Sequence, residues 1–319
     1  MNKVKSREAL PILLMAFNRP KTLERQLLNL DSLSPRKIVI HVDGATRSTQ
    51  ESQKSVLKLA ECWAEKSEHN IEIRAKDTNL GLLKHFPIAA SDFFSSHTFG
   101  IILEDDIDFG PSFIDMCEQA FNSKSLNDLW SICGHNPSGK FLKGNRVQVS
   151  LRLSHIHTIW GWATSSFNIE RYLSYGSKTK DQIFKDIDAF SKERTRDIFL
   201  QRSIKLTWRR KIARYLHPNS GGSWDNLWEL AGWKSKLPSL MPSHSLSTEF
   251  VHPNESGTHA STRAFHKFYS EVPINSISAV SKQSNYLDIQ MMKMWGISRK
   301  YSWGYALRIA SQLRDFDKS

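Results

Sequence analysis

The chain has 319 residues, of which 39% are hydrophobic and 24% charged, and a formal net charge of +12 at pH 7. These fractions are typical of a folded globular protein and exclude an intrinsically disordered chain. The three cysteines are widely spaced and form no CxxC pair, which argues against a disulfide framework or a thiolate zinc site and favours a reducing compartment.

The N-terminal third alternates predicted strands with predicted helices. Apolar runs that end in turn residues predict strands at 10–16, 37–42, 71–75 and 100–103. Helical spacing of apolar residues predicts helices at 22–30, 50–66 and 81–94. Such units predict an α/β fold of Rossmann-like type, with a mostly parallel sheet and helices on both faces. Ligands bind such sheets at the carboxyl ends of the strands.

The remaining two thirds are less regular. We predict helices at 111–122, 178–216, 224–233 and 291–314, the last in a basic, Trp-rich tail, and further strands at 131–134, 147–151 and 238–249. We divide the chain into one domain, 9–265, and a helical C-terminal extension, 266–319. Within the domain, residues 9–110 are expected to bind a nucleotide and residues 111–265 an acceptor.

The apolar run 9–17 is the longest in the chain, yet it is about half as long as a membrane-spanning helix of about 20 residues. It also lacks the small-residue cleavage site of a signal peptide. We therefore interpret it as a buried strand. The sequence predicts a cytoplasmic protein without a signal peptide or transmembrane helix.

The positive charge is local. Residues 1–110 contain 15 bases and 15 acids, whereas 192–214 contain nine bases and two acids, and 290–319 contain six and two. Basic segments with aromatic residues suit an anionic membrane surface, although a solvated helix face has the same pattern. We expect the two patches to hold the protein at the inner face of the cell membrane.

Three adjacent carboxylates, Glu104, Asp105 and Asp106, follow the fourth predicted strand. Their mutual repulsion is tolerable if a divalent cation neutralises them, and Mg²⁺ or Mn²⁺ typically binds one or two carboxylates together with substrate phosphates. An acidic turn before the helix at Pro111 would explain the same residues. The segment therefore predicts either a metal site or a helix cap.

Asp225 lies between Trp224 and Trp228 at the start of a predicted helix. A carboxyl in an apolar setting can act as a general base, because desolvation raises carboxyl pKa values toward neutral pH. An aspartate that caps a helix has the same position in a sequence and is the commoner case. Both interpretations stay open from this segment.

Four further segments have two interpretations each. Trp162, in 158–163, could stack on a sugar or pack in the core, and His259 could bind a metal or be an ordinary surface residue. Arg19 and Asp43 could bind a nucleobase and ribose, although Asn-x-Pro and Asp-Gly are also favoured turn sequences.

In this order, the segments resemble the GT-A glycosyltransferases, in the style of the N-acetylglucosaminyltransferase I branch and of similar bacterial sugar transferases. The resemblance covers about residues 10–259. It rests on Phe17-Asn18-Arg19-Pro20, His41-Val42-Asp43-Gly44, Asn79-Leu80-Gly81, Leu103-Glu104-Asp105-Asp106, Trp160-Gly161-Trp162 and Trp224-Asp225-Asn226-Leu227-Trp228. It implies a nucleotide-sugar donor, with UDP as the nucleotide, and Mn²⁺ or Mg²⁺ as the cofactor.

The resemblance also implies roles for individual residues. Asp106 matches the member of the acidic triplet that binds the metal, Asp105 would face the ribose or the sugar, and Glu104 would face the donor sugar. His259 lies where a late loop closes over the diphosphate. The residues implied in binding the nucleotide are Phe17, Arg19 and Asp43. Those implied near the acceptor are Trp162, Trp224 and Asp225, of which Asp225 is the general base.

These roles describe a metal-dependent, inverting hexosyl- or N-acetylhexosaminyltransferase. Its acceptor would be a glycan or lipid-linked hydroxyl in polysaccharide or lipopolysaccharide assembly. A retaining glycosyltransferase on the same fold is the first alternative. A sugar nucleotidyltransferase is disfavoured because 16–20 contains no glycine. A nucleic-acid-binding protein is the alternative from another class, but no recognition motif accompanies 192–214, and the acidic triplet would repel a polyanion.

Overall fold

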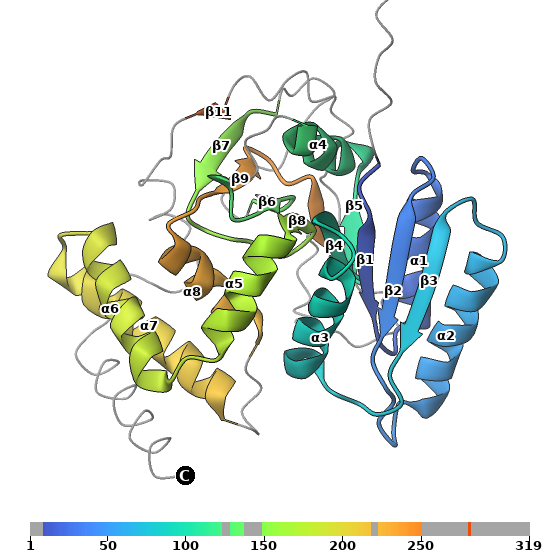
Figure 1. Cartoon of the computed structure of the whole chain (residues 1–319), viewed down its shortest axis with the longest axis horizontal. Helices are drawn as coiled ribbons and strands as arrows, with labels where there is room; N and C mark the ends of the chain where they lie inside the picture. Colours follow the sequence, from blue (N-terminus) through green and yellow to red (C-terminus); the bar gives the residue numbers. More distant parts are fainter. Residues whose placement is uncertain (1–8, 123–127, 137–148, 218–222, 251–279, 282–319) are drawn as a thin grey trace, which may run out of the picture.

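The computed structural model describes residues 9–122, 128–136, 149–217, 223–250 and 280–281 (Figure 1). His259, the predicted helix 291–314 and the extension 266–319 apart from Val280–Ser281 lie outside the described residues. No helix in the described ranges is long and apolar enough to cross a bilayer.

The N-terminal third forms the strand and helix units that the sequence predicts. The strands are β1 (Ile12–Ala16), β2 (Lys37–Val42), β3 (Asn70–Ala75) and β4 (Phe99–Glu104). They are parallel and lie in the order β3-β2-β1-β4. The helices between them are α1 (Pro20–Asp31), α2 (Gln50–Ala64) and α3 (Leu82–Phe94). All four strands therefore end at the same edge of the sheet.

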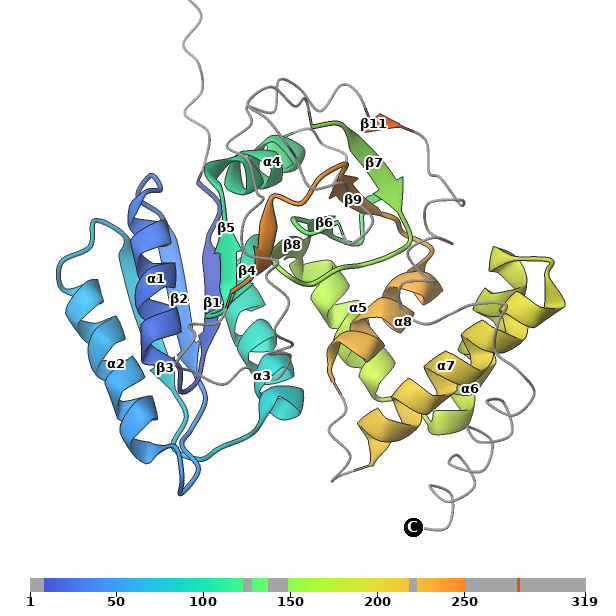
Figure 2. The same ribbon diagram turned by 180° about the vertical axis from the view of Figure 1, so that it is seen from behind.

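Alternating side chains of β1 pack into two separate cores. Ile12 and Leu14 belong to a buried cluster with apolar residues of α1 and α2, whereas Leu13 and Met15 belong to a cluster with residues of α3. Successive residues of a strand point to opposite faces of its sheet. Helices thus cover both faces, as Figures 1 and 2 show.

The same sheet continues into the second part of the chain. Beyond β4 lie β8 (Trp162–Ser165), β6 (Ile132–Cys133), β9 (Ser239–Pro242), β7 (Leu151–Ser154) and β11 (Val280–Ser281). Five of the eight strand pairs in the described sheet are parallel, and β8 is antiparallel to both of its neighbours. The predicted α/β fold, a mostly parallel sheet with helices on both faces, is confirmed.

One predicted helix of the second part is divided into two in the structure. The segment predicted as one helix at 178–216 is two, α6 (Lys180–Arg194) and α7 (Ile198–Leu216), which pack against each other. The Asp197 carboxylate starts α7 by accepting hydrogen bonds from the N–H groups of Phe199 and Leu200, as N-cap residues do. The remaining helices are α4 (Pro111–Asn122), α5 (Ser166–Gly176) and α8 (Asp225–Ser235).

The segment predicted as one strand at 238–249 also divides. Its first part is β9, and its second part, β10 (Ser247–Glu249), pairs with β5 (Ile107–Phe109) in a separate antiparallel ribbon. In that pairing Glu249 lies opposite Ile107, the residue after the acidic triplet. The ribbon therefore brings the end of the described domain beside Asp106.

Candidate active site

Two adjoining cavities lie where the strands end. The strand-end cavity has a volume of about 440 Å³ and is lined by Met15, Ala16, Phe17, Asn18, Arg19, Asp43, Asn79, Gly81, Leu82, His85, Glu104 and Asp105. The tryptophan cavity, of about 280 Å³, is lined by Leu82, Glu104, Asp106, His135, His157, Thr158, Ile159, Trp160, Trp208, Lys211, Ser223, Trp224, Asp225, Glu229 and Glu249. Leu82 and Glu104 line both cavities and mark their junction.

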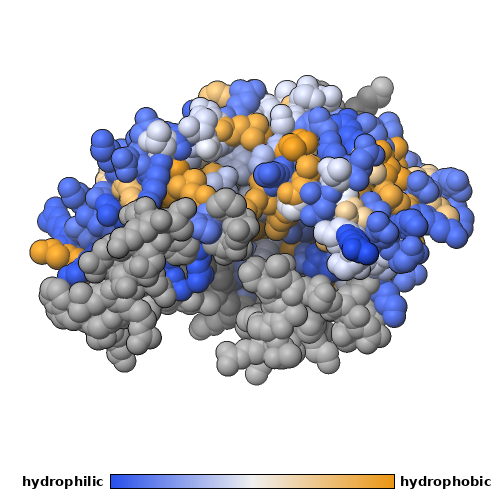
Figure 3. Space-filling model, turned by 90° about the horizontal axis from the view of Figure 1, so that it is seen from below, coloured by the Kyte–Doolittle hydropathy of each residue, from blue (hydrophilic) through white to orange (hydrophobic). Residues whose placement is uncertain are grey.

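The strand-end cavity brings together the residues predicted to bind a nucleotide. Phe17 and Arg19 follow β1, Asp43 follows β2, and Glu104 and Asp105 lie at the end of β4. The carboxyl ends of adjacent parallel strands meet at one edge of a sheet, which explains why distant segments converge there. Figure 3 views the molecule from the side toward which these strand ends point, and hydrophobic residues gather near the centre of that face.

Arg19 lies directly on the acidic triplet. Its guanidinium donates hydrogen bonds to Asp105 and to the Asp106 Oδ2 atom, the latter at 2.6 Å. Burial raises the pKa of Asp105 to about 6, although the Arg19 charge opposes this shift. In this structure Arg19 therefore supplies a positive charge that offsets part of the negative charge of the two aspartates, a contact that the sequence did not predict.

The donors present fit a divalent cation only in part. Oδ2 of Asp105 is buried and has no hydrogen-bond partner in the described structure, so one hard oxygen ligand is uncommitted. However, no group of three or more His, Cys, Asp or Glu side chains in the described ranges is arranged to hold a metal. A cation here would bind one or two carboxylates and complete its shell with waters and phosphate oxygens, as Mg²⁺ usually does.

Asp43 holds the wall of the strand-end cavity. Its two carboxylate oxygens accept hydrogen bonds from the N–H groups of Gly44, Leu80 and Gly81, each at 2.9 Å. Gly81, which starts α3, has a φ angle of 70°, in the region that favours glycine. The carboxylate thereby fixes the 79–81 loop. The role of Asp43 in this structure is therefore to stabilise that loop.

Asp225 is the first residue of α8 and lines the tryptophan cavity. Its Oδ1 atom is enclosed and has no hydrogen-bond partner among the residues described. The preceding Trp224 is buried, and its ring stacks on Phe86 with centroids 3.5 Å apart. A carboxylate oxygen without a partner, on a rigid aromatic support, is available to accept a proton from a bound hydroxyl.

Two residues of this cavity were missed by the sequence analysis. Glu229 lies one helical turn after Asp225, and burial raises its pKa to about 8 even though it accepts hydrogen bonds from the His157 N–H and the Trp233 indole. Lys211 lies over the Trp208 ring at 4.3 Å, and burial lowers its pKa. The sequence spacing could have indicated both residues, since residues three or four apart share one face of a helix. Glu229 follows Asp225 by four residues, and Lys211 follows Trp208 by three.

Lys211 also changes the interpretation of the basic segment 192–214. This segment was expected to be a surface patch, yet Lys211 and Trp208 turn one face of α7 into the cavity. The cavity contains five carboxyl groups and one ammonium group among its described lining residues. Because the pKa values of Glu104 and Glu229 are raised to about 8, these two are largely neutral at pH 7, and the negative charge of the cavity comes from the other three carboxyl groups.

The tryptophans that line the cavity are not all the ones predicted to lie near the acceptor. Trp162 is 1% exposed, packs against Phe86 and Trp228, and lines neither cavity. Trp160, two residues earlier, lines the tryptophan cavity together with Trp208 and Trp224. Trp162 thus packs in the core, and the aromatic wall comes from its neighbour and from α7 and α8.

Glu104 stands at the junction of the two cavities. Burial raises its pKa to about 8, and the negative charges of Asp106 and Asp105 raise it further in the same direction. A carboxyl with this pKa is largely protonated at neutral pH and can donate a hydrogen bond. The acidic triplet therefore contains one largely neutral group, Glu104, and two aspartates that share Arg19 as a partner.

Comparisons with known proteins complete the description. No protein-family model and no curated protein matches the chain. It is similar in structure to a mannosyltransferase from Pyrobaculum calidifontis in complex with GDP-Man and Mn²⁺, with a TM-score of 0.39 and 11% identity over 72% of this chain and 70% of that chain.

The chain is also similar to a structure described as a glucose-1-phosphate thymidylyltransferase from Bacillus anthracis in complex with sucrose. The TM-score is 0.31 and the identity 9%, over 54% of this chain and 77% of that chain. The function proposed for the protein therefore rests on its own residues.

Proposed function

We propose that the protein is a metal-dependent, inverting glycosyltransferase that moves a hexose or N-acetylhexosamine from UDP to an acceptor hydroxyl. The observation that supports this function is the junction of two cavities at Glu104, with Asp225 in one and the ends of β1, β2 and β4 in the other. The nucleotide would occupy the strand-end cavity, and the acceptor the tryptophan cavity. The donor sugar would lie between them.

The reaction needs one proton acceptor and one group that stabilises the leaving diphosphate. Asp225 would take the proton of the acceptor hydroxyl while that oxygen bonds to the anomeric carbon. The bond from this carbon to the diphosphate oxygen breaks, and the diphosphate leaves with the electron pair. When bound, Mn²⁺ or Mg²⁺ supplies positive charge at the diphosphate, with Asp106 as its protein ligand and His259 as a predicted second one.

Glu104 and Arg19 would assist without transferring the sugar. Glu104, protonated at neutral pH, can donate a hydrogen bond to a hydroxyl of the donor sugar. Arg19 can exchange its contacts with Asp105 and Asp106 for a diphosphate oxygen, since guanidinium groups bind carboxylates and phosphates by the same geometry. Asp105 and Asp106 would then be free to hold a cation.

The tryptophan cavity favours a neutral acceptor sugar. Trp160 offers a partly exposed aromatic face, whereas Trp208 and Trp224 line the same space with buried rings. Three lining carboxylates, Asp106, Asp225 and Glu249, would repel an anionic sugar, and Lys211 is the single lysine or arginine among the described lining residues. We propose a neutral glycan, free or lipid-linked, as the acceptor.

The membrane is the second proposed partner, and the turn between α6 and α7 supports it. Ile198 and Phe199 are 76% and 69% exposed there, next to Arg194 and Arg196. In Figure 1 this turn lies at the opposite end of the molecule from α2. Exposed apolar residues flanked by bases suit the interface of an anionic bilayer.

Vesicle sedimentation tests this partner. The paired change Ile198→Ser and Phe199→Ser is expected to reduce sedimentation with phosphatidylglycerol vesicles, while Leu28→Ser, at a residue 66% exposed on α1, leaves it unchanged. Equal sedimentation with phosphatidylcholine vesicles would remove the electrostatic part of the proposal, and an unchanged double variant would remove the turn.

A thermal-shift screen tests the enzymatic proposal. A ligand that binds only the native state raises its apparent stability, so we expect one UDP-sugar to raise the melting temperature in the presence of Mn²⁺ and not in excess EDTA. The anomeric configuration of the product, read by NMR, then distinguishes inversion from retention. A screen in which no nucleotide sugar shifts the melting temperature would contradict the proposed function.

A further inference from the structure

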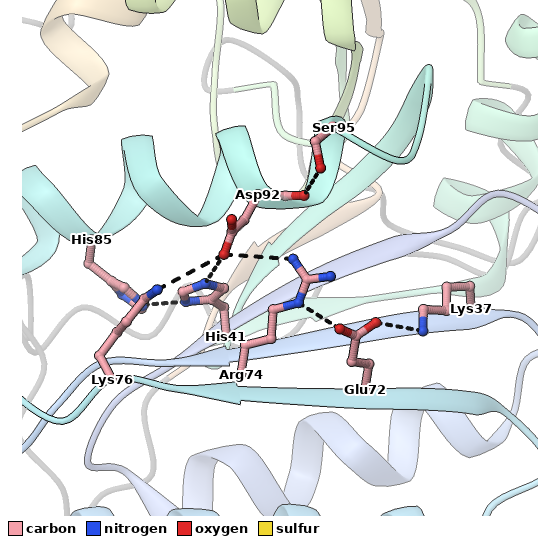
Figure 4. A network of polar contacts seen from close by, with 8 residues as sticks. All are labelled: Lys37, His41, Glu72, Arg74, Lys76, His85, Asp92 and Ser95. Atoms are coloured by element: carbon pink, nitrogen blue, oxygen red, sulfur yellow. Dashed lines mark hydrogen bonds and ion pairs between the residues drawn. The ribbon is translucent and has the colours of Figure 1, made fainter.

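A chain of three polar side chains, two of them buried, lies behind the strand-end cavity. Figure 4 shows His41 of β2 between His85 and Asp92, both on α3. The His41 Nδ1 atom is 2.8 Å from the His85 Nε2 atom, and the His41 Nε2 atom is 3.5 Å from the Asp92 Oδ2 atom. Both histidines are buried. The three residues form one line from the surface carboxylate to the cavity wall.

The sequence explains why the three side chains meet. His41 occupies the position in β2 whose neighbours Ile40 and Val42 pack on the α1 and α2 face, so the imidazole points to the α3 face. His85 and Asp92 are seven residues apart, which places them two turns apart on one side of a helix. The imidazole of His41 fits between them.

This arrangement defines where the protons lie. Burial lowers the pKa of His41 and lowers that of His85 to about 4, so both rings are neutral at pH 7 and each has one N–H. Asp92 carries two neighbouring cations, Arg74 at 3.7 Å and Lys76 at 3.9 Å, and its carboxylate can only accept.

The Asp92 carboxylate determines the direction of both hydrogen bonds. His41 donates from Nε2 to Asp92, which leaves its Nδ1 as an acceptor. His85 must therefore donate from Nε2 to His41, and its own Nδ1 carries a lone pair. Within the described ranges no hydrogen bond engages this Nδ1 atom, and His85 lines the strand-end cavity.

We propose that Asp92 and His41 hold His85 in a single tautomer, with Nδ1 unprotonated, so that His85 accepts a hydrogen bond from an O–H or N–H group of the nucleoside. This inference rests on the proposed function, because it places a nucleotide in the strand-end cavity. His85 would contact the ligand directly. His41 and Asp92 are positioning residues, because they determine that His85 accepts the hydrogen bond and does not donate it.

The binding test uses UDP and its analogues with Mn²⁺ in isothermal titration calorimetry. A neutral hydrogen bond contributes a threefold to tenfold change in affinity, so His85→Phe is expected to weaken UDP binding by about that factor. One analogue, 2′-deoxy-UDP, 3′-deoxy-UDP or N3-methyl-UDP, should bind the wild type more weakly and bind His85→Phe no more weakly than UDP does. The analogue that behaves in this way identifies the donor group.

His97→Phe is the matched control, since His97 contacts Phe93 near the far end of α3 and lines neither cavity. It is expected to keep the wild-type affinities for UDP and all three analogues. If every analogue loses the same affinity in the wild type and in His85→Phe, the inference is overturned while the proposed function stands. If UDP does not bind the wild type, the proposed function fails first.

The tautomer is measured independently by long-range ¹H–¹⁵N NMR of the full chain. The wild type should show the His85 Nδ1 shift of an unprotonated nitrogen, and Asp92→Asn should mix the tautomers, because an amide can donate as well as accept. It should also weaken UDP binding less than His85→Phe does. A protonated Nδ1 in the wild type would overturn the proposal.

Discussion

The carboxylates of the strand-end cavity are engaged by backbone N–H groups or by Arg19, apart from Oδ2 of Asp105, whereas the tryptophan cavity contains a carboxylate with an unpartnered oxygen in the described structure and a carboxyl group whose pKa is raised to about 8. Asp43 accepts three backbone N–H bonds, and Asp105 is paired with Arg19. Across the junction, Asp225 has an enclosed oxygen without a partner in the described structure, and burial raises the pKa of Glu229 to about 8. A region that only binds a ligand can hold its charged groups in fixed, neutralised contacts. A region that transfers protons needs groups whose pKa lies near the working pH.

Asp225→Asn should give the largest effect, and it separates the two regions. An amide cannot take the acceptor proton, so turnover should fall by about 1000-fold, within the range for loss of a general base. The affinity for UDP with Mn²⁺ should stay unchanged, because Asp225 lines only the tryptophan cavity. Turnover with the donor found by screening and calorimetry with UDP measure the two quantities.

Asp115→Asn on α4 is the control for this prediction, because Asp115 is exposed and lines neither cavity. It should keep both turnover and affinity. Near-normal turnover of Asp225→Asn would mean that another group, with Glu229 as the nearest candidate, accepts the proton.

Asp106→Ala should give the next largest effect, and it acts on binding. Removing the proposed metal ligand should lower turnover by about 100-fold and abolish the difference in UDP affinity between Mn²⁺ and excess EDTA. The readout is calorimetry under both conditions. Full wild-type activity in excess EDTA would contradict the metal assignment irrespective of this variant.

Asp43→Ala should lower the free energy of unfolding rather than act on the catalytic step. It leaves the N–H groups of Gly44, Leu80 and Gly81 without their acceptor, which should reduce the free energy of unfolding by about 3 kcal/mol. Urea denaturation measures the change. A loss under 0.5 kcal/mol would show that water or another group replaces the carboxylate.

Glu229→Gln should give the smallest effect, a change in how stability depends on pH. The pKa of Glu229 is raised from 4.5 to about 8 in the folded protein, so the folded state binds the extra proton between these values. Its contribution to stability is full below pH 4.5 and is lost as the pH rises toward 8. The stability of the variant relative to the wild type should therefore increase steadily as the pH rises across this window.

Urea denaturation at several pH values follows this gain. Glu61→Gln, at an exposed residue of α2, is the matched control and should run parallel to the wild type. A constant difference between Glu229→Gln and the wild type from pH 5 to pH 8 would show that the carboxyl of Glu229 titrates normally.

The sheet could be predicted from the sequence because its signals are local. Apolar runs such as 10–16 end in turn residues, and alternation within them assigns each side chain to a face. The acidic triplet and Asp225 also follow directly from their places at the end of a strand and the start of a helix. These residues do line the two cavities.

The contacts that need tertiary packing could not be predicted. Arg19 reaches the acidic triplet across 86 and 87 residues, and His41 meets His85 across 44. Trp162 enters the core while Trp160 lines a cavity, and only the position of β8 between β4 and β6 decides this. Pairings over such distances depend on the arrangement of the sheet, which no short pattern encodes.

A crystal structure with UDP and Mn²⁺ tests the division of labour between the cavities most directly. We expect the nucleoside in the strand-end cavity beside His85, the diphosphate and the metal at the junction of the cavities by Glu104 and Asp106, and no nucleoside in the tryptophan cavity. A nucleotide bound against Trp208 and Asp225, with the strand-end cavity vacant, would contradict the account.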